Sequence, residues 1–208
     1  MLRGLSALLV CLCASGTAFA ATVQVEVRTP NGEPLANAVV TVSGPSSSPI
    51  ATPGKLAIEQ KNLQFHPYVL VVPRGASVAF PNLDQTRHHV YSFSPTGPFE
   101  LKLFASGETR SVKFDKVGTI AVGCNIHDQM SAFIRVTDAP WMAITDANGV
   151  AAIPDVEAGS RVIEVWHPLQ SGSQDASLKR NVTVTANAGI LQSFELAVRK
   201  PLKIHSHY

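Results

Sequence analysis

The sequence has little cysteine and little charge, and each shortage excludes a class of protein. Three of the 208 residues are cysteines, and only Cys124 lies beyond position 13. An internal disulfide after that position is therefore excluded, and a single thiol in the body of the chain needs another explanation, of which metal ligation is one. Charged residues make up 15% of the chain, the formal net charge is +2, and no basic run exceeds two residues. We expect no nucleic acid and no anionic membrane among its partners.

The chain also lacks a long hydrophobic run. The apolar stretch from residue 5 to 14 is too short to cross a bilayer comfortably. It follows Met1-Leu2-Arg3 and leads to Ala18-Phe19-Ala20, which is the order of a basic region, an apolar region and a small-residue cleavage site. We expect residues 1–20 to be a signal peptide and the mature protein to be periplasmic or otherwise exported, with no membrane insertion after cleavage. A lipoprotein anchor at one of the two early cysteines is the alternative, but neither follows the small residues that such a site resembles.

Period-two alternation of apolar and polar residues recurs in short blocks along the chain and predicts β-strands. The blocks are residues 22–28, 38–43, 68–72, 77–80, 88–93, 100–104, 111–116, 119–122, 131–136, 162–166, 182–186 and 193–198. Turn signals such as Pro73-Arg74-Gly75 separate them at the close spacing of a sandwich or barrel. No window has a helical repeat. The sequence therefore predicts an all-β protein.

One short loop carries three residues that can ligate a metal. Cys124, His127 and Met130 follow the spacing Cys-x-x-His-x-x-Met between the predicted strands 119–122 and 131–136. Upstream, His88-His89 begins another predicted strand, so a second imidazole can reach the loop. Neighbouring strand residues face opposite ways, so one of these two histidines should ligate and the other should not. We expect His88 to be the ligand.

This donor set favours copper. Thiolate and thioether ligands suit Cu(I), imidazole suits both oxidation states, and two imidazoles with a thiolate and a long methionine bond form an electron-transfer site. Zinc would accept three of the four ligands but gains little from methionine. Each residue also has an ordinary role: a lone Cys124 or Met130 is most often core packing, and a lone histidine is a satisfied polar residue. The combination carries the prediction of one copper ion on His88, Cys124, His127 and Met130.

Residues 78–90, together with Cys124, His127 and Met130, resemble the ligand segments of the cupredoxins, specifically the amicyanin and plastocyanin branch. The chain also resembles exported methylamine utilisation proteins through residues 88–94 and 124–130. The resemblance covers residues 55–137 and implies a Greek-key β-sandwich or barrel that holds copper on His88. It places His89 where relatives often have asparagine. Asp128-Gln129 departs from the apolar neighbours usual in the family, which favours a redox partner recognised by polar contacts.

A second resemblance concerns the flanking segments. Residues 23–40 resemble the opening strands of carboxypeptidase regulatory-like domains, which are small transthyretin-like or Ig-like sandwiches, and residues 145–159 look like the closing half of the same family. We therefore expect one split domain of residues 21–50 and 138–198, a cupredoxin insertion at 55–137, and a flexible tail at 199–208. Two separate small units are the alternative. Trp141 and Trp166 are assigned to the core of the later unit.

The resulting hypothesis is a periplasmic mononuclear blue-copper protein that carries single electrons between redox partner proteins. We expect no enzyme activity, because the sequence has no nucleophile elbow, zinc-protease helix or phosphate loop. Copper storage or delivery and a metal-free structural binding module are the alternatives. Structural roles are assigned to His66 and His167, and the pair His205 and His207 is assigned to a solvated end.

Overall fold

The computed structural model describes residues 20–47, 49–51 and 54–199. All regular secondary structure in these residues is β-strand. The all-β prediction is therefore confirmed. The described residues contain no helix with the length and apolarity of a membrane span. The predicted signal peptide, apart from Ala20, lies outside the described residues. So does the predicted tail apart from Arg199, and with it His205 and His207.

The middle of the chain forms one group of sheets, in which a five-stranded sheet has the order β5-β11-β10-β7-β8. Strands β6 and β9 form one two-stranded sheet, and β3 and β4 form another. The bounds are β3 Glu59–Lys61, β4 Gln64–His66, β5 Val69–Pro73, β6 Ala76–Pro81, β7 His88–Ser92, β8 Phe99–Phe104, β9 Thr109–Phe114, β10 Gly118–Cys124 and β11 Ser131–Thr137. Alternate side chains of these strands, among them Val90 and Cys124, form one apolar core, which Met130 joins from the loop before β11.

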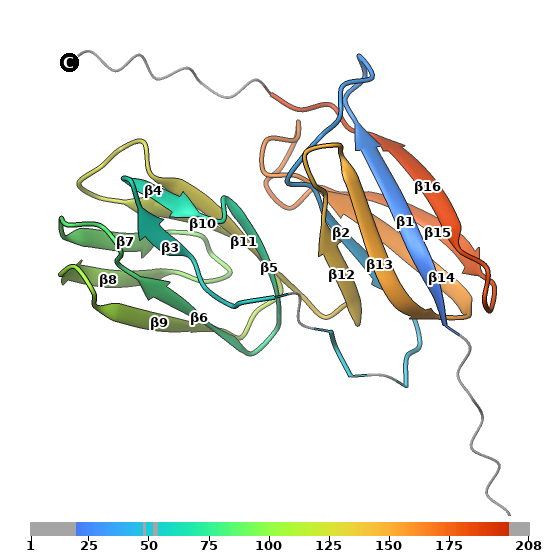
Figure 1. Cartoon of the computed structure of the whole chain (residues 1–208), viewed down its shortest axis with the longest axis horizontal. Helices are drawn as coiled ribbons and strands as arrows, with labels where there is room; N and C mark the ends of the chain where they lie inside the picture. The colour runs from blue at the N-terminus through green and yellow to red at the C-terminus, as the bar shows by residue number, and fades with distance from the viewer. Residues whose placement is uncertain (1–19, 48, 52–53, 200–208) are drawn as a thin grey trace, which may run out of the picture.

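The two ends of the chain form a second group of sheets. Here β1 lies between β13 and β16, and β2 lies between β12 and β14, with β15 beyond β14. The bounds are β1 Ala20–Arg28, β2 Val39–Ser43, β12 Trp141–Ile144, β13 Val150–Glu157, β14 Gly159–Trp166, β15 Leu178–Val184 and β16 Ile190–Glu195. The two sheets share an apolar core that contains Trp141. Early and late strands thus lie side by side, and the middle group lies beside them (Figure 1).

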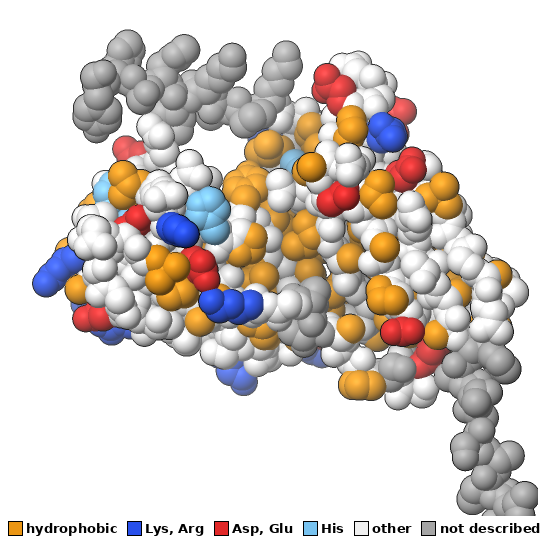
Figure 2. Space-filling model, viewed as in Figure 1, with side chains coloured by type: hydrophobic (Ala, Val, Ile, Leu, Met, Phe, Trp, Pro, Cys, Tyr) orange, Lys and Arg blue, Asp and Glu red, His pale blue; other side chains and the backbone are white. Residues whose placement is uncertain are grey.

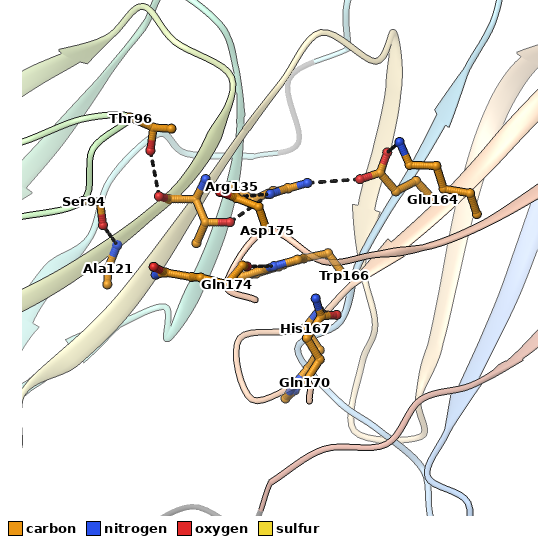
Figure 3. A network of polar contacts seen from close by, with 12 residues as sticks. Ser94, Thr96, Ala121, Arg135, Glu164, Trp166, His167, Gln170, Gln174 and Asp175 are labelled. Carbon is orange, nitrogen blue, oxygen red and sulfur yellow. Dashed lines mark hydrogen bonds and ion pairs between the residues drawn. The ribbon is translucent and has the colours of Figure 1, made fainter. Parts of the chain in front are cut away.

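Apolar and polar contacts join the two groups. Trp166 is buried with Val69 and Val71 of β5, in a cluster separate from the core of the terminal sheets. The assignment of Trp166 to that core was therefore wrong, because its ring faces the middle group. Figure 2 shows hydrophobic side chains gathered along the line where the groups meet. The carboxylate of Asp175 also accepts hydrogen bonds from the Thr119 backbone N–H and from Arg135, which bring the 167–177 loop onto β10 and β11 (Figure 3).

Four strands were not predicted, and the residues explain why. Strands β3 and β4 are three residues each, and the turn between them places Asn62 and Leu63 at positive φ, which is uncommon for leucine. In β13, Pro154 and Asp155 resemble a turn. The register of β1 and β13 shifts between Ala21 and Val23, so Pro154 and Asp155 together lie opposite a single residue of β1 and form a bulge. Strand β12 has four residues and no alternating burial.

Candidate metal centre

Strand pairing brings His88 and Cys124 to the same point of the middle group. His88 is the first residue of β7, and Cys124 is the last residue of β10. The two strands are antiparallel, with Cys124 opposite Val90. His88 lies two residues from Val90 and therefore on the same face of the sheet. Both side chains point into the core: His88 is fully buried and Cys124 is 3% exposed.

The loop between β10 and β11 supplies the third side chain. The sulfur of Cys124 lies 3.6 Å from Nδ1 of His88 and 3.7 Å from Nδ1 of His127. All three atoms lie within 4.8 Å of one another. A sulfur bonded to one ion at about 2.3 Å and a nitrogen at about 2.05 Å, roughly 110° apart, are about 3.6 Å from each other. The cluster therefore has the spacing of a mononuclear metal site.

The two adjacent histidines differ in their surroundings. His88 turns Nδ1 toward Cys124, and its Nε2 lies 2.8 Å from a carboxylate oxygen of Asp84. His89 lies on the other side of the strand, where its Nε2 is 2.9 Å from Glu100. The pairing of β7 with β8 is irregular between His88 and Val90, and His89 is the residue between them. Of the pair, the structure brings only His88 into the cluster.

Met130 closes the loop. Its backbone N–H donates to the carbonyl of His127 at 2.9 Å, which tightens the turn after the second histidine. Its side chain is 2% exposed and belongs to the apolar core that also contains Cys124. Met130 as the fourth ligand stays a prediction.

The other predicted histidines lie elsewhere. His66 is exposed at the end of β4. His167 is buried, its Nε2–H donates to the carbonyl of Ala36, and its Nδ1 accepts the N–H of Leu169. Burial lowers the pKa of His167 in spite of the hydrogen bond to Ala36, so the neutral ring fits this position. In the described part of the chain, the group His88, Cys124 and His127 is the one set of histidine, cysteine and acidic residues spaced to hold a metal.

Asp84 is the residue of this site that sequence reasoning missed. It lies in the turn before β7, four residues from His88, among scattered acids that no motif distinguishes. Spacing to the predicted ligand was the one usable signal, because metal-bound histidines commonly donate their second N–H to a carboxylate.

The fold and the cluster together define a β-sandwich protein with a His-Cys-His group of metal-ligating geometry, in which His88 and Cys124 are buried and His127 is half-buried. No known family matches the sequence, and no curated protein matches it either. Solved structures do resemble part of the chain. The Cu-containing nitrite reductase of Thermus scotoductus SA-01 is 26% identical, over 46% of this chain and 25% of the reductase, with a TM-score of 0.38. This chain thus spans about a quarter of that protein.

Two smaller proteins are similar to part of this chain over nearly their whole length. A purple cupredoxin from Nitrosopumilus maritimus is 19% identical, over 40% of this chain and 100% of that one, with a TM-score of 0.36. A point mutant of amicyanin in its Cu(I) form is 22% identical, over 47% of this chain and 98% of amicyanin, with a TM-score of 0.37. In each comparison the similarity covers less than half of this chain.

Proposed function

We propose that this chain is a mononuclear blue-copper protein that carries single electrons between redox partner proteins in the periplasm. One copper ion would be bound by His88, Cys124 and His127, with Met130 as a weaker fourth ligand. The convergence of one sulfur and two Nδ1 atoms at 3.6 and 3.7 Å carries the proposal. Copper, when bound, supplies a one-electron couple between Cu(II) and Cu(I).

The residues around the cluster suit electron transfer better than catalysis. His88 and Cys124 are buried, so neither offers a free face to a substrate. Both are held by the pairing of β7 with β10. A site fixed in this way changes little in geometry between oxidation states, which favours rapid transfer. The thiolate and thioether donors favour copper over zinc.

His127 is the half-buried member of the cluster and provides a route for the electron. Exposed aliphatic side chains lie beside the site: Ile126 precedes His127, Leu83 precedes Asp84, and the Leu63 N–H donates to the Asp84 carboxylate. These aliphatic side chains favour a partner with an apolar contact surface. The partner recognised by polar contacts, expected from Asp128-Gln129, stays a prediction, and both kinds of contact are part of the proposal.

We also propose that the chain consists of a split terminal domain of residues 21–50 and 138–198 and an inserted copper domain of residues 55–137. The pairing of β1 with β13 and of β2 with β14 supports this division, because strands from both ends complete the same sheets. A carboxypeptidase regulatory-like origin of the terminal domain and export through a signal peptide are further parts of the proposal.

Visible and electron paramagnetic resonance spectra after copper addition test the function. Wild-type protein should show an intense thiolate-to-Cu(II) band that disappears on reduction and returns on oxidation. Cys124→Ala and His88→Ala should lack this band, whereas the matched variant His89→Ala should keep it. A wild-type protein without the band contradicts the proposal, and so does a band that survives Cys124→Ala. Rapid loss of copper to a chelator would favour storage or delivery instead.

A further inference from the structure

The buried histidine of the cluster is held on both sides of its ring. Nδ1 faces the Cys124 sulfur, and Nε2 lies 2.8 Å from Oδ2 of Asp84. A carboxylate oxygen only accepts hydrogen bonds, so Nε2 must carry the proton in this contact. In the neutral ring, Nδ1 then carries the lone pair and faces the Cys124 sulfur, as a metal ligand requires.

Asp84 is itself fixed by its surroundings. The same oxygen, Oδ2, accepts the backbone N–H of Leu63 at 3.2 Å, from the turn between β3 and β4. The backbone N–H of Asp84 donates to the side chain of Asn82 at 3.0 Å. Asn82 is fully buried and donates in turn to the carbonyls of Thr86 and Phe104. Asp84 therefore lies in a rigid turn, and its side chain is only 11% exposed.

We propose that Asp84 is a positioning residue of the metal centre that fixes the Nε2–H form of His88 and lowers the reduction potential of bound copper. The second part rests on the proposed function. Cu(II) has one more positive charge than Cu(I), so a nearby negative charge stabilises the oxidised ion more. Little water reaches the contact between the fully buried His88 and Asp84, so solvent screens this effect weakly.

The chain offers a matched control for this inference. Glu100 accepts a hydrogen bond from the adjacent His89 at 2.9 Å, so it forms the same type of contact on the opposite side of β7. Its side chain is 55% exposed, and His89 lies outside the cluster. Neutralising Glu100 removes one negative charge from the same region of the protein without touching His88.

The first experiment measures the copper midpoint potential in wild type, Asp84→Asn and Glu100→Gln by spectroelectrochemistry. Asparagine keeps an acceptor oxygen for His88 and Leu63 but removes the charge. We expect Asp84→Asn to lower the ratio of Cu(II) affinity to Cu(I) affinity about tenfold, which raises the potential by about 59 mV. Glu100→Gln should leave it nearly unchanged. A shift in Asp84→Asn no larger than that in Glu100→Gln overturns the proposal.

The second experiment needs no copper and reads the tautomer of His88 by nitrogen-15 NMR of the full chain. Wild type and Asp84→Asn should show a single Nε2–H form, whereas Asp84→Ala should show a mixture of the two tautomers. A mixture in the wild type overturns the positioning role. Thermal unfolding confirms that each variant is folded. If no variant, nor the wild type, gives a thiolate-to-copper band, the proposed function fails, and the NMR result still decides the role of Asp84.

Discussion

Arg135 of β11 and Glu164 of β14 form an ion pair of 3.0 Å that joins the five-stranded sheet to the four-stranded sheet. Arg135 also binds Asp175 at 2.8 Å, and its guanidinium lies 5.5 Å from the ring centre of Trp166. Burial raises the pKa of Glu164. The hydrogen bond from Ser177 and the charges of Lys179 and Arg135 outweigh this effect and hold the pKa below its ordinary value. One buried cation thus orders acidic groups and an aromatic ring from the neighbouring sheet group.

Replacing Arg135 by alanine should destabilise the protein by about 2 kcal/mol, because Glu164 and Asp175 lose a partner that water only partly replaces. Lys179→Ala is the control, since Lys179 also pairs with Glu164 but is 62% exposed. Lys179→Ala should destabilise the protein by about 0.5 kcal/mol. Urea unfolding measures both. Equal losses for the two variants would show that Arg135 has no special role at this junction.

Met130 should matter to the copper couple beyond its contribution to packing. Met130→Leu conserves volume, so we expect less than about 1.5 kcal/mol of destabilisation. Loss of the thioether should raise the midpoint potential and change the visible spectrum. Met142→Leu is the matched control, because Met142 is also buried but lies in the cluster between the sheet groups. Identical spectra and potentials for both variants would exclude Met130 as a ligand.

Gly149 should tolerate no side chain. A Cβ there would lie 2.5 Å from the carbonyl oxygen of Val27, and its φ is +74°. Gly32 has a similar φ of +81° but no atom within 4 Å of the same position. Gly32→Ala should therefore cost about 1 kcal/mol from backbone strain alone. Gly149→Ala should cost about 3 kcal/mol or more, because the β1 backbone must also move. Thermal unfolding separates the two, and similar losses would contradict the close approach.

The buried His167 should make stability depend on pH. Burial lowers the pKa of His167 in the folded protein below its ordinary 6.5, so protonation favours the unfolded chain. The contribution of the neutral His167 to the free energy of unfolding is complete above pH 6.5. It is lost as the pH falls below that value toward the folded-state pKa.

His167→Asn keeps an acceptor for the N–H of Leu169 and removes the titration. Between about pH 7.5 and pH 5.5, this variant should lose less unfolding free energy than wild type, by at most about 1.4 kcal/mol per pH unit. Urea unfolding at each pH provides the measurement, and His66→Asn, at an exposed position, is the control. The same pH slope in wild type and His167→Asn would refute the prediction.

The all-β architecture could be predicted because successive side chains of a strand face opposite ways, so a strand with one buried face alternates between apolar and polar residues. The first and last residues of the strands were harder to predict. Cys124 was expected in a loop, yet it ends β10, since pairing with β7 continues through Gly123 and Cys124. The face of Trp166 also could not be predicted, because a large apolar residue fits a core and a junction equally well.

The meeting of His88, Cys124 and His127 was predictable for a specific reason. Cys124 and His127 are only three residues apart, at the end of β10 and in the loop that follows it, and alternation along β7 allows only one of the two adjacent histidines to face inward. Asp84 could not be predicted in the same way. Its contact with His88 depends on the conformation of the turn before β7 and on the N–H of Leu63, which a turn of unusual φ directs toward it. Such a contact comes from tertiary structure and leaves no periodic pattern in the sequence.

The enclosure of Cys124 limits how fast its thiol can be oxidised to a disulfide. With 3% of its surface exposed, the thiol cannot approach the sulfur of another copy to the roughly 2.05 Å of a disulfide unless β10 separates from its neighbours. Covalent dimers should therefore form only as fast as the sheet opens. The rate at which a small reagent alkylates the Cys124 thiol would then measure how fast the sheet opens.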